Sequence, residues 1–199
     1  MSNKSMLGMT IFVASDVVFF TVLILSFVFY RDSLANKGLP NDFNSLDVGV
    51  TAIYSVCLYA SSLTNWLASR SHRRGDLKMW RSWLVLTILL GAAFIYGEAT
   101  EYHHLVSVDK LVPNTNLFGT SFYILTGFHG FHVTMGLILL AILLVLTFTA
   151  TDTFKGGARA GAVEAISIYW HFVDAVWVVI FPTVYLWSLV GPSWAASGH

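Results

Sequence analysis

The sequence has little charge and almost no cysteine. Of its 199 residues, 11% are Asp, Glu, Lys or Arg, whereas a soluble globular domain carries about 25%. Its 11 basic and 11 acidic residues balance to a formal net charge of zero, so nucleic acid is not an expected partner. The one cysteine, Cys57, cannot form an internal disulfide and is interpreted as a packed thiol within an apolar run.

Apolar residues are in excess: they make up 56% of the sequence and give a mean hydropathy of +0.68. Five apolar segments are long enough for a transmembrane helix, which needs about 20 residues. They span residues 6–30, 48–69, 79–100, 119–150 and 162–190. The sequence therefore predicts an all-α fold, a polytopic membrane helix bundle of five transmembrane helices in a single membrane domain over residues 1–199.

The placement of basic residues predicts the orientation of the bundle, because Lys and Arg concentrate on the cytoplasmic side of membrane proteins. Eight lie on the side of the N-terminus (Lys4, Arg70, Arg73, Arg74, Lys78, Arg81, Lys155 and Arg159) and three on the other (Arg31, Lys37 and Lys110). We expect the N-terminus in the cytoplasm and the C-terminus outside. Arg81 and its basic neighbours are either plain topology signals or ligands for anionic lipid headgroups.

Ionisable residues inside the predicted spans are candidates for function, because an ionisable side chain at membrane depth is costly and faces protein. In the last segment, YWHFVDAVW places His171 and Asp174 three residues apart, on one helix face. In the first segment, ASDVVFF holds Asp16, either an acid satisfied by a neighbouring helix or a carboxylate linked to protons or lipid. The tryptophans Trp170, Trp177, Trp187 and Trp194 are interpreted as packing or interfacial, and Pro182 is expected to bend the last helix.

The third segment ends in FIYGEATEYHH, which places Glu98 and Glu101 three residues apart. Glu98 lies deeper and is expected to face a partner. The run Tyr102, His103 and His104 that follows is interpreted either as an interfacial aromatic belt or as part of a functional cluster.

The fourth segment holds TGFHGFHVTMG, with His129 and His132 on one face. Two readings stay open: metal or haem ligation, with His171 as a second haem ligand, or hydrogen bonding to Asp174, Asp16 or lipid headgroups. By depth, Asp16, His129, His132, His171 and Asp174 are expected to meet near the middle of the membrane. Gly127, Gly130 and Gly136 predict close approach of a neighbouring helix.

TGFHGFHVTMG followed by YWHFVDAVW resembles subunit III of the haem–copper terminal oxidases, and the resemblance covers essentially the whole chain. ASDVVFF resembles the first motif of the five-helix bacterial form, GEATEYHHL resembles the carboxylate-rich motif, and SRSHRRGDLKMW fits the basic loop. Two departures stand out. Longer members have seven spans, the first two of which wall a lipid-filled cleft and have no counterpart here, and many relatives have Glu in place of Asp16.

The resemblance implies a subunit III of a proton-pumping cytochrome c oxidase (aa3/caa3-like) in a bacterial plasma membrane. It implies no redox centre in this chain, with haem and copper held by subunits I and II. The chain would pack on subunit I, bind phospholipid and sustain proton uptake and turnover, with cytochrome c or a larger respiratory supercomplex as a further partner. The residues carried over as packing, lipid-facing or proton-environment groups, with no catalytic residue or metal ligand among them, are Asp16, Glu98, Glu101, His129, His132, Trp170, His171 and Asp174.

Other functions stay open at this point. Within the family, a quinol oxidase or a nitric-oxide-reductase-associated homologue is an alternative, although the wording of the two histidine motifs favours cytochrome c as the donor. Outside it, a bis-histidine haem protein would need His171 with His129 or His132 as iron ligands. A small proton-coupled transporter is a third class, but the sequence lacks the paired halves with broken helices that are common in such carriers.

Overall fold

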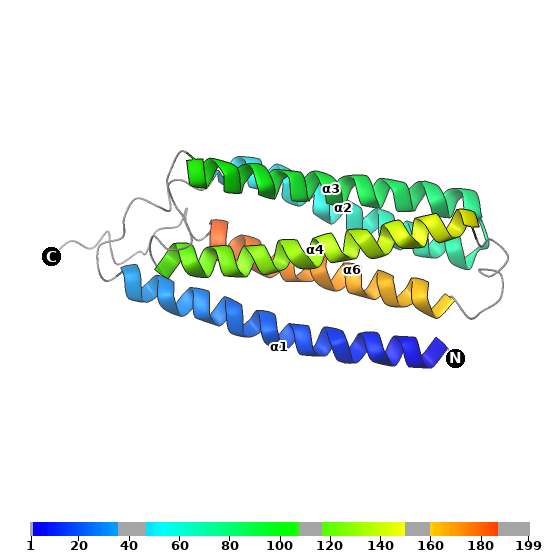
Figure 1. Cartoon of the computed structure of the whole chain (residues 1–199), viewed down its shortest axis with the longest axis horizontal. Coiled ribbons are helices and arrows are strands. Elements are labelled where there is room, and N and C mark those ends of the chain that lie inside the picture. Colours follow the sequence, from blue (N-terminus) through cyan, green and yellow to red (C-terminus); the bar gives the residue numbers. More distant parts are fainter. Residues whose placement is uncertain (1, 36–46, 108–116, 150–159, 187–199) are drawn as a thin grey trace.

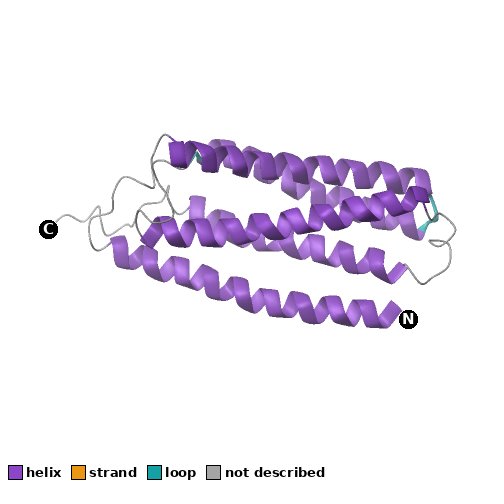
Figure 2. Ribbon diagram, viewed as in Figure 1, coloured by secondary structure: helices purple, strands orange, loops and turns teal. Residues whose placement is uncertain are grey.

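The structure, a computed structural model, describes residues 2–35, 47–107, 117–149 and 160–186, and every regular element within these ranges is helical. The helices are α1 (Ser2–Ala35), α2 (Val48–Arg73), α3 (Leu77–Ser107), α4 (Leu117–Thr149) and α6 (Ala160–Phe181). They lie side by side along one long axis (Figures 1 and 2). The predicted all-α bundle is confirmed. Residues 150 and 187–190 of the predicted segments, with Trp187 and Trp194, lie outside the described residues.

Two aspartates set the starts of α2 and α3. The Asp47 carboxylate accepts a hydrogen bond from Val50 N at 3.0 Å, and the Asp76 carboxylate accepts one from Met79 N at 3.0 Å. Each satisfies an amide that the first helical turn leaves unpaired. Between the two helices Gly75 has a φ of +75°, a left-handed conformation that glycine adopts without strain. The α2–α3 connection is therefore a tight turn.

The bend expected at Pro182 stays a prediction; what the structure shows there is a π-helical segment, Pro182–Leu186, that continues α6. Proline has no N–H to donate to the preceding turn, and a π-helical turn is one way in which a helix accommodates such a gap. Within this segment Tyr185 is 1% exposed, so the altered turn directs its ring into the bundle.

Two helices form the centre of the bundle. α6 packs against α1, α2 and α4, while α4 packs against α1, α3 and α6. Figure 1 shows α1 along one edge and the α2–α3 pair along the other, with α4 and α6 between them. Side chains of α4 and α6 therefore reach every other described helix, which places their histidines and tryptophans at the helix contacts.

Apolar side chains lie on the outside of this bundle and polar ones on the inside, which is the reverse of a soluble protein. Large apolar side chains such as Leu25 and Phe29 point outward, with 62% and 70% of their surface exposed. Hydroxyls such as those of Ser61, Thr87 and Thr126 are fully buried. Apolar patches this extensive mark contact with lipid or with other proteins, so the bundle is built for an apolar surrounding.

Within the described residues, four helices are long and apolar enough to cross a membrane: Met6–Tyr30, Leu77–Ser107, Gly119–Thr149 and Gly161–Leu186. The predicted segment 48–69, now α2, is a helix of sufficient length but is less apolar than these four. Its polar side chains are turned into the bundle, where Thr51, Ser55, Ser61, Thr64, Asn65 and Ser69 are buried. Its outer face is apolar, since Ile53, Val56 and Leu63 are among its most exposed residues.

Candidate functional site

A row of polar contacts joins α6 to α2. Trp177 Nε1 donates to Ser55 Oγ at 2.8 Å, and Trp170 Nε1 donates to Ser61 Oγ at 3.1 Å. Asn65 and Ser69 extend the row through their contacts with Ser167. A buried polar group that loses its partner costs about 1–3 kcal/mol, so the row fixes the relative position of the two helices.

Trp170 is the residue at which α3, α4 and α6 meet. Its side chain is fully buried. A methyl group added at Gly91 of α3 or at Gly136 of α4 would lie 2.8 Å from its ring, closer than carbon atoms approach. The two glycines therefore make the space that the indole fills. The interpretation of Trp170 as a packing residue is confirmed, as is the predicted close approach at Gly136.

Asp16 of α1 lies against His132 of α4, with 3.4 Å between Asp16 Oδ2 and His132 Nε2. His132 Nδ1 is 2.7 Å from the carbonyl oxygen of Phe128. A carbonyl only accepts, so Nδ1 carries a hydrogen and Nε2 is the nitrogen left for the carboxyl. The Tyr169 hydroxyl donates to the backbone carbonyl of His132 at 3.0 Å, which ties α6 to the same place.

His129 lies one turn from His132 but in a different environment. It is fully buried, stacks on Trp177 with 4.8 Å between ring centroids, and meets the edges of Phe20 and Phe94. Neither of its ring nitrogens has a hydrogen-bond partner among the described residues. His129 is therefore packed as an aromatic ring among rings from α1, α3 and α6.

His171 and Asp174 face α2. His171 Nδ1 lies 2.7 Å from the Ser62 hydroxyl. Asp174 is 4% exposed, and neither carboxylate oxygen has a partner at hydrogen-bond distance and geometry within the described residues. Ser62 and Tyr59 of α2 are close enough to interact electrostatically with this carboxylate.

The expectation that all five ionisable groups meet in one site is wrong. Asp16 and His132 meet beside Tyr169, whereas His171 and Asp174 face Ser62. Tyr169 and His171 are two residues apart, which is about 200° around a helix, so α6 presents them to opposite neighbours. Of the predicted contacts, the structure shows that of His132 with Asp16 and not one between a histidine and Asp174.

A second polar cluster lies where α3 meets α2, α4 and the π-helical segment. The Tyr102 hydroxyl lies 2.6 Å from Thr126 Oγ1 and donates to Glu98 Oε1 at 3.4 Å. The Tyr185 hydroxyl donates to Glu101 Oε2 at 2.9 Å. The interfacial reading is therefore wrong for Tyr102, which points into the bundle, while His103 and His104 lie on the surface.

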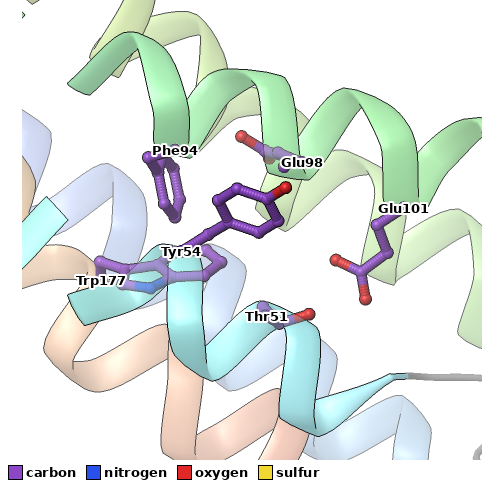
Figure 3. A pocket seen from close by; sticks show the side chains of 7 residues that line it. Thr51, Tyr54, Phe94, Glu98, Glu101 and Trp177 are labelled. Carbon is purple, nitrogen blue, oxygen red and sulfur yellow. The ribbon is translucent and has the colours of Figure 1, made fainter. Parts of the chain in front are cut away.

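The two glutamates border a small cavity, lined also by Thr51, Tyr54 and Trp177 (Figure 3). Its volume, about 10 Å³ for the centre of a water molecule, is close to the least that holds one water. Figure 3 shows the Tyr54 ring between the side chains of Glu98 and Glu101.

The glycines of α4 differ in how closely they approach α3. A methyl group at Gly130 would lie 2.7 Å from a carboxylate oxygen of Glu98, so this glycine makes room for the glutamate and the predicted close approach is confirmed there. At Gly127 the nearest atom would be the Tyr102 hydroxyl at 3.6 Å. That is ordinary contact, and the prediction is wrong for Gly127.

Arg81 binds the end of α4. Its Nε donates to Thr147 Oγ1 at 3.0 Å, a second nitrogen donates to the Thr147 carbonyl, and the guanidinium lies 4.3 Å from the centroid of the Phe148 ring. A cation at a helix C-terminus stabilises the unpaired carbonyls of the last turn. Lipid binding by Arg81 stays a prediction, whereas this contact within the chain is observed.

Sequence reasoning missed the partners that hold the site residues in place. They are chiefly hydroxyl side chains and glycines: Ser55, Ser61, Ser62, Gly91 and Thr147. A signal was present for α2, because serines at positions 55, 62 and 69 recur every seven residues and so lie on one helix face. Gly91 and Thr147 carry no such pattern, since their role depends on which side chain another helix brings to them.

Long helices with apolar exteriors, buried hydroxyls and paired ionisable groups define a multi-pass membrane protein. A family model described as cytochrome c oxidase subunit III matches residues 2–189 of the sequence. The chain belongs to the cytochrome c oxidase subunit III family, and it is therefore a subunit of a haem–copper oxidase, an oxidoreductase complex with other subunits.

Curated relatives agree with this assignment. The chain is 37% identical over 185 residues to a probable cytochrome c oxidase subunit 3 of Mycobacterium tuberculosis, which covers 92% of this chain and 88% of the relative. It is 35% identical over 184 residues to cytochrome c oxidase subunit 3 of Corynebacterium diphtheriae, with the same coverage. It is also 33% identical over 187 residues to quinol oxidase subunit 3 of Bacillus subtilis, covering 94% of this chain and 89% of that one.

Proposed function

We propose that the chain is the non-catalytic subunit III of a proton-pumping cytochrome c oxidase of the aa3/caa3 type in a bacterial plasma membrane. As one membrane domain, it would pack on subunit I, belong to a complex with subunit II, and sustain proton uptake while oxygen is reduced to water. The observation that carries this proposal is that ionisable side chains of the spans contact side chains of neighbouring helices. Asp16 meets His132, Glu101 meets Tyr185 and His129 is enclosed by rings, which makes helix contacts rather than a reaction centre.

In this proposal all five helices cross the membrane, with the N-terminus in the cytoplasm. α2 supports this because its 26 residues exceed the span length. Its buried face is polar, and Ile53, Val56 and Leu63 face outward at 66%, 64% and 59% exposure. Hydroxyls that bond within the bundle are compatible with a membrane, since every polar group there must be satisfied internally.

We expect reporters on the two ends of the chain to lie on opposite sides of the membrane, because an odd number of spans separates them. A cytoplasm-dependent fluorescent reporter should therefore be active at the N-terminus, and a periplasm-dependent enzyme reporter should be active at the C-terminus. A C-terminal reporter that stays in the cytoplasm would contradict both the number of spans and the orientation.

Phospholipid binding is part of the proposal. On α4 an outward-facing apolar hollow of about 550 Å³ is lined by Thr120, Tyr123, Ile124, Gly127, Phe128 and Phe131. Its wall is almost wholly hydrocarbon, which suits an acyl chain, and Phe128 meets Phe19 of α1 with 5.2 Å between ring centroids. The hollow therefore lies close to the α1–α4 contact that also holds Asp16.

A bis-histidine haem protein is less well supported by the histidine environments. His129 is enclosed by aromatic rings, and the Nδ1 atoms of His132 and His171 face Phe128 O and Ser62 Oγ. His132 lies on α4 and contacts Asp16 of α1, whereas His171 lies on α6 and contacts Ser62 of α2. Within the described residues, no group of three His, Cys, Asp or Glu side chains is placed to hold a metal ion.

The electron donor is proposed to be cytochrome c. Relatives at 35–37% identity bear the cytochrome c oxidase name, while one at 33% is named as a quinol oxidase subunit. The donor site lies on other subunits, so the sequence of the accompanying subunit II decides the matter. A binuclear copper motif of Cys and His there supports cytochrome c, and its absence supports quinol.

The proposal as a whole is tested by purification from the native membrane through a tag on this chain, in mild detergent. We expect two further polypeptides, the haem-bearing subunit I and subunit II, in constant ratio to the tagged chain. A monodisperse, helical chain that purifies without them would overturn the proposed function.

The Asp16–His132 contact leads to a prediction about sustained activity. Asp16→Ala removes the carboxyl from the α1–α4 contact without touching a redox centre, so initial oxygen consumption should stay close to that of the parent. During prolonged turnover the variant oxidase should inactivate several times faster, whereas Asp16→Glu, which keeps the carboxyl, should behave like the parent. Oxygen-electrode traces at constant reductant measure both phases, and identical inactivation time courses for Asp16→Ala and parent would contradict this role.

A further inference from the structure

One face of α6 is only partly covered by the other described helices. Its residues are Glu164, Ile168, His171, Ala175 and Val178, which are partly or fully exposed and follow one another at intervals of four and three. That spacing keeps them on one side of a helix. We call this surface the His171 face. α1 packs on a different side of α6, where Phe12 and Phe20 meet Tyr169 and Phe172.

His171 is a polar group that this face leaves incompletely satisfied. It lies near the middle of the 26-residue span Gly161–Leu186. Its Nδ1 atom contacts Ser62, whereas Nε2 has no hydrogen-bond partner among the described residues. A lipid acyl chain cannot form a hydrogen bond, and polar side chains at this depth face protein or water. A neighbouring helix that brings a polar group to Nε2 would satisfy this nitrogen.

The surroundings of His171 suit a second helix. Ala175, one turn further along α6, is exposed and small, and small residues let helix backbones approach closely in a membrane. Tyr59 and Ser62 of α2 are partly exposed beside it, so the polar area extends across two helices. Buried behind it, Asp174 has no hydrogen-bond partner among the described residues.

The other outward surfaces differ in chemistry. α1 presents Leu25 and Phe29, and α3 presents Val85, Leu86 and Leu89, all strongly exposed. These apolar side chains are satisfied by lipid tails. The His171 face differs from them because it carries polar side chains near the middle of a span. There the hydrogen-bonded pair Ser62 and His171 reaches the outside of the described bundle, and one ring nitrogen of His171 is still to be paired.

We propose that the His171 face docks a transmembrane helix of another oxidase subunit, and that this helix presents a hydrogen-bonding side chain to Nε2 of His171. The inference rests on the proposed function, because it takes the oxidase complex as the source of the helix. It adds to that function the surface by which this chain binds the other subunit, and the kind of side chain that lies opposite His171.

The direct test is site-specific photo-crosslinking in the native membrane, with a photoreactive amino acid at position 175 and, as the matched control, at position 92. Ala92 is also an exposed alanine but lies on α3. We expect position 175 to crosslink to a subunit of the co-purifying oxidase, identified by mass spectrometry of the tryptic peptides, and position 92 to crosslink to lipid. Crosslinks from position 175 only to lipid, or only to a second copy of this chain, would overturn the proposal.

Substitutions supply an independent readout. Ala175→Phe should lower the amount of chain that co-purifies with the oxidase at least about fivefold, since overpacking by 1–3 kcal/mol corresponds to factors of that order, while Ala92→Phe should leave it unchanged. His171→Leu should weaken association and His171→Gln, which keeps a hydrogen-bonding group, should restore most of it. Circular dichroism and gel filtration of each variant show whether it folds; a folded Ala175→Phe chain that co-purifies like Ala92→Phe would contradict the docking surface.

The two proposals fail in different ways. If the parent chain never co-purifies with an oxidase, the proposed function fails. If the parent co-purifies but Ala175→Phe and His171→Leu do so equally well, the oxidase assignment stands and the docking surface is wrong.

Discussion

Trp170→Ala should destabilise the bundle by about 3–5 kcal/mol, the usual cost of truncating a buried aromatic side chain to alanine. The indole is fully buried, fills the space made by Gly91 and Gly136, and donates to Ser61. Its loss leaves a cavity among α3, α4 and α6 and removes the hydrogen bond to Ser61, whose hydroxyl keeps its own bond to the Leu58 carbonyl. Thermal and chemical unfolding of the purified chain in detergent, followed by circular dichroism, measures the change.

Trp66→Ala is the matched control for Trp170→Ala. Trp66 is 44% exposed on α2, and the Arg70 guanidinium lies over its ring, 5.4 Å from the ring centroid. Exposed cation–π pairs contribute only about 0.5–1 kcal/mol. A loss of stability at Trp66 equal to that at Trp170 would show that the indole does not organise the helix contacts.

Gly97→Ala should disrupt the α2–α3 pair, because the added methyl group would overlap the Tyr54 ring of α2. The ring is bounded by the Glu98–Glu101 cavity, so it must either enter the cavity or push α2 away from α3. Overpacking of this kind costs about 1–3 kcal/mol. We expect a lower unfolding temperature and less chain in the assembled oxidase.

Two further variants make the Gly97 prediction specific. Gly127→Ala adds the same methyl group where the nearest atom is 3.6 Å away, and it should be neutral. In a double-mutant cycle, Tyr54→Ala should relieve much of the loss caused by Gly97→Ala, because it removes the ring that clashes. Strictly additive effects of the two substitutions would mean that the methyl group at position 97 does not act through the Tyr54 ring.

The sequence predicted the helices well because apolar runs of about 20 residues are typical of membrane-spanning helices. It also predicted that Glu98 faces a partner and that Asp16 and His132 can pair inside the bundle, because an ionisable side chain in a span needs protein around it. The contact between Asp16 and His132 was one of the pairings that depth alone allowed.

The single shared site was predicted wrongly because depth does not specify the side of a helix. Asp16, His132, His171 and Asp174 lie at similar depths, yet α6 turns His171 toward Ser62 and Tyr169 toward His132. Which side each residue takes depends on where α2 and α1 pack on α6. That arrangement is set by contacts such as Trp177 with Ser55, between residues more than a hundred positions apart.

Tyr102 shows a second limit of sequence reasoning. Its position beside two histidines near a span end matched an interfacial belt, but α3 continues to Ser107 and carries the tyrosine along the inner face. Its hydroxyl then meets Thr126 and Glu98. The end of a hydrophobic run and the end of a helix are different boundaries, and the second depends on packing.

The central claim is that the buried acids and imidazoles of this chain hold helices together beside a redox centre that belongs to other subunits. The most direct test is the reduced-minus-oxidised visible spectrum and metal content of the chain expressed and purified without its partner subunits. The account predicts no Soret band and no stoichiometric iron or copper, while the assembled complex isolated through the same chain shows both. A haem spectrum from the chain alone that disappears in His171→Ala would contradict the account.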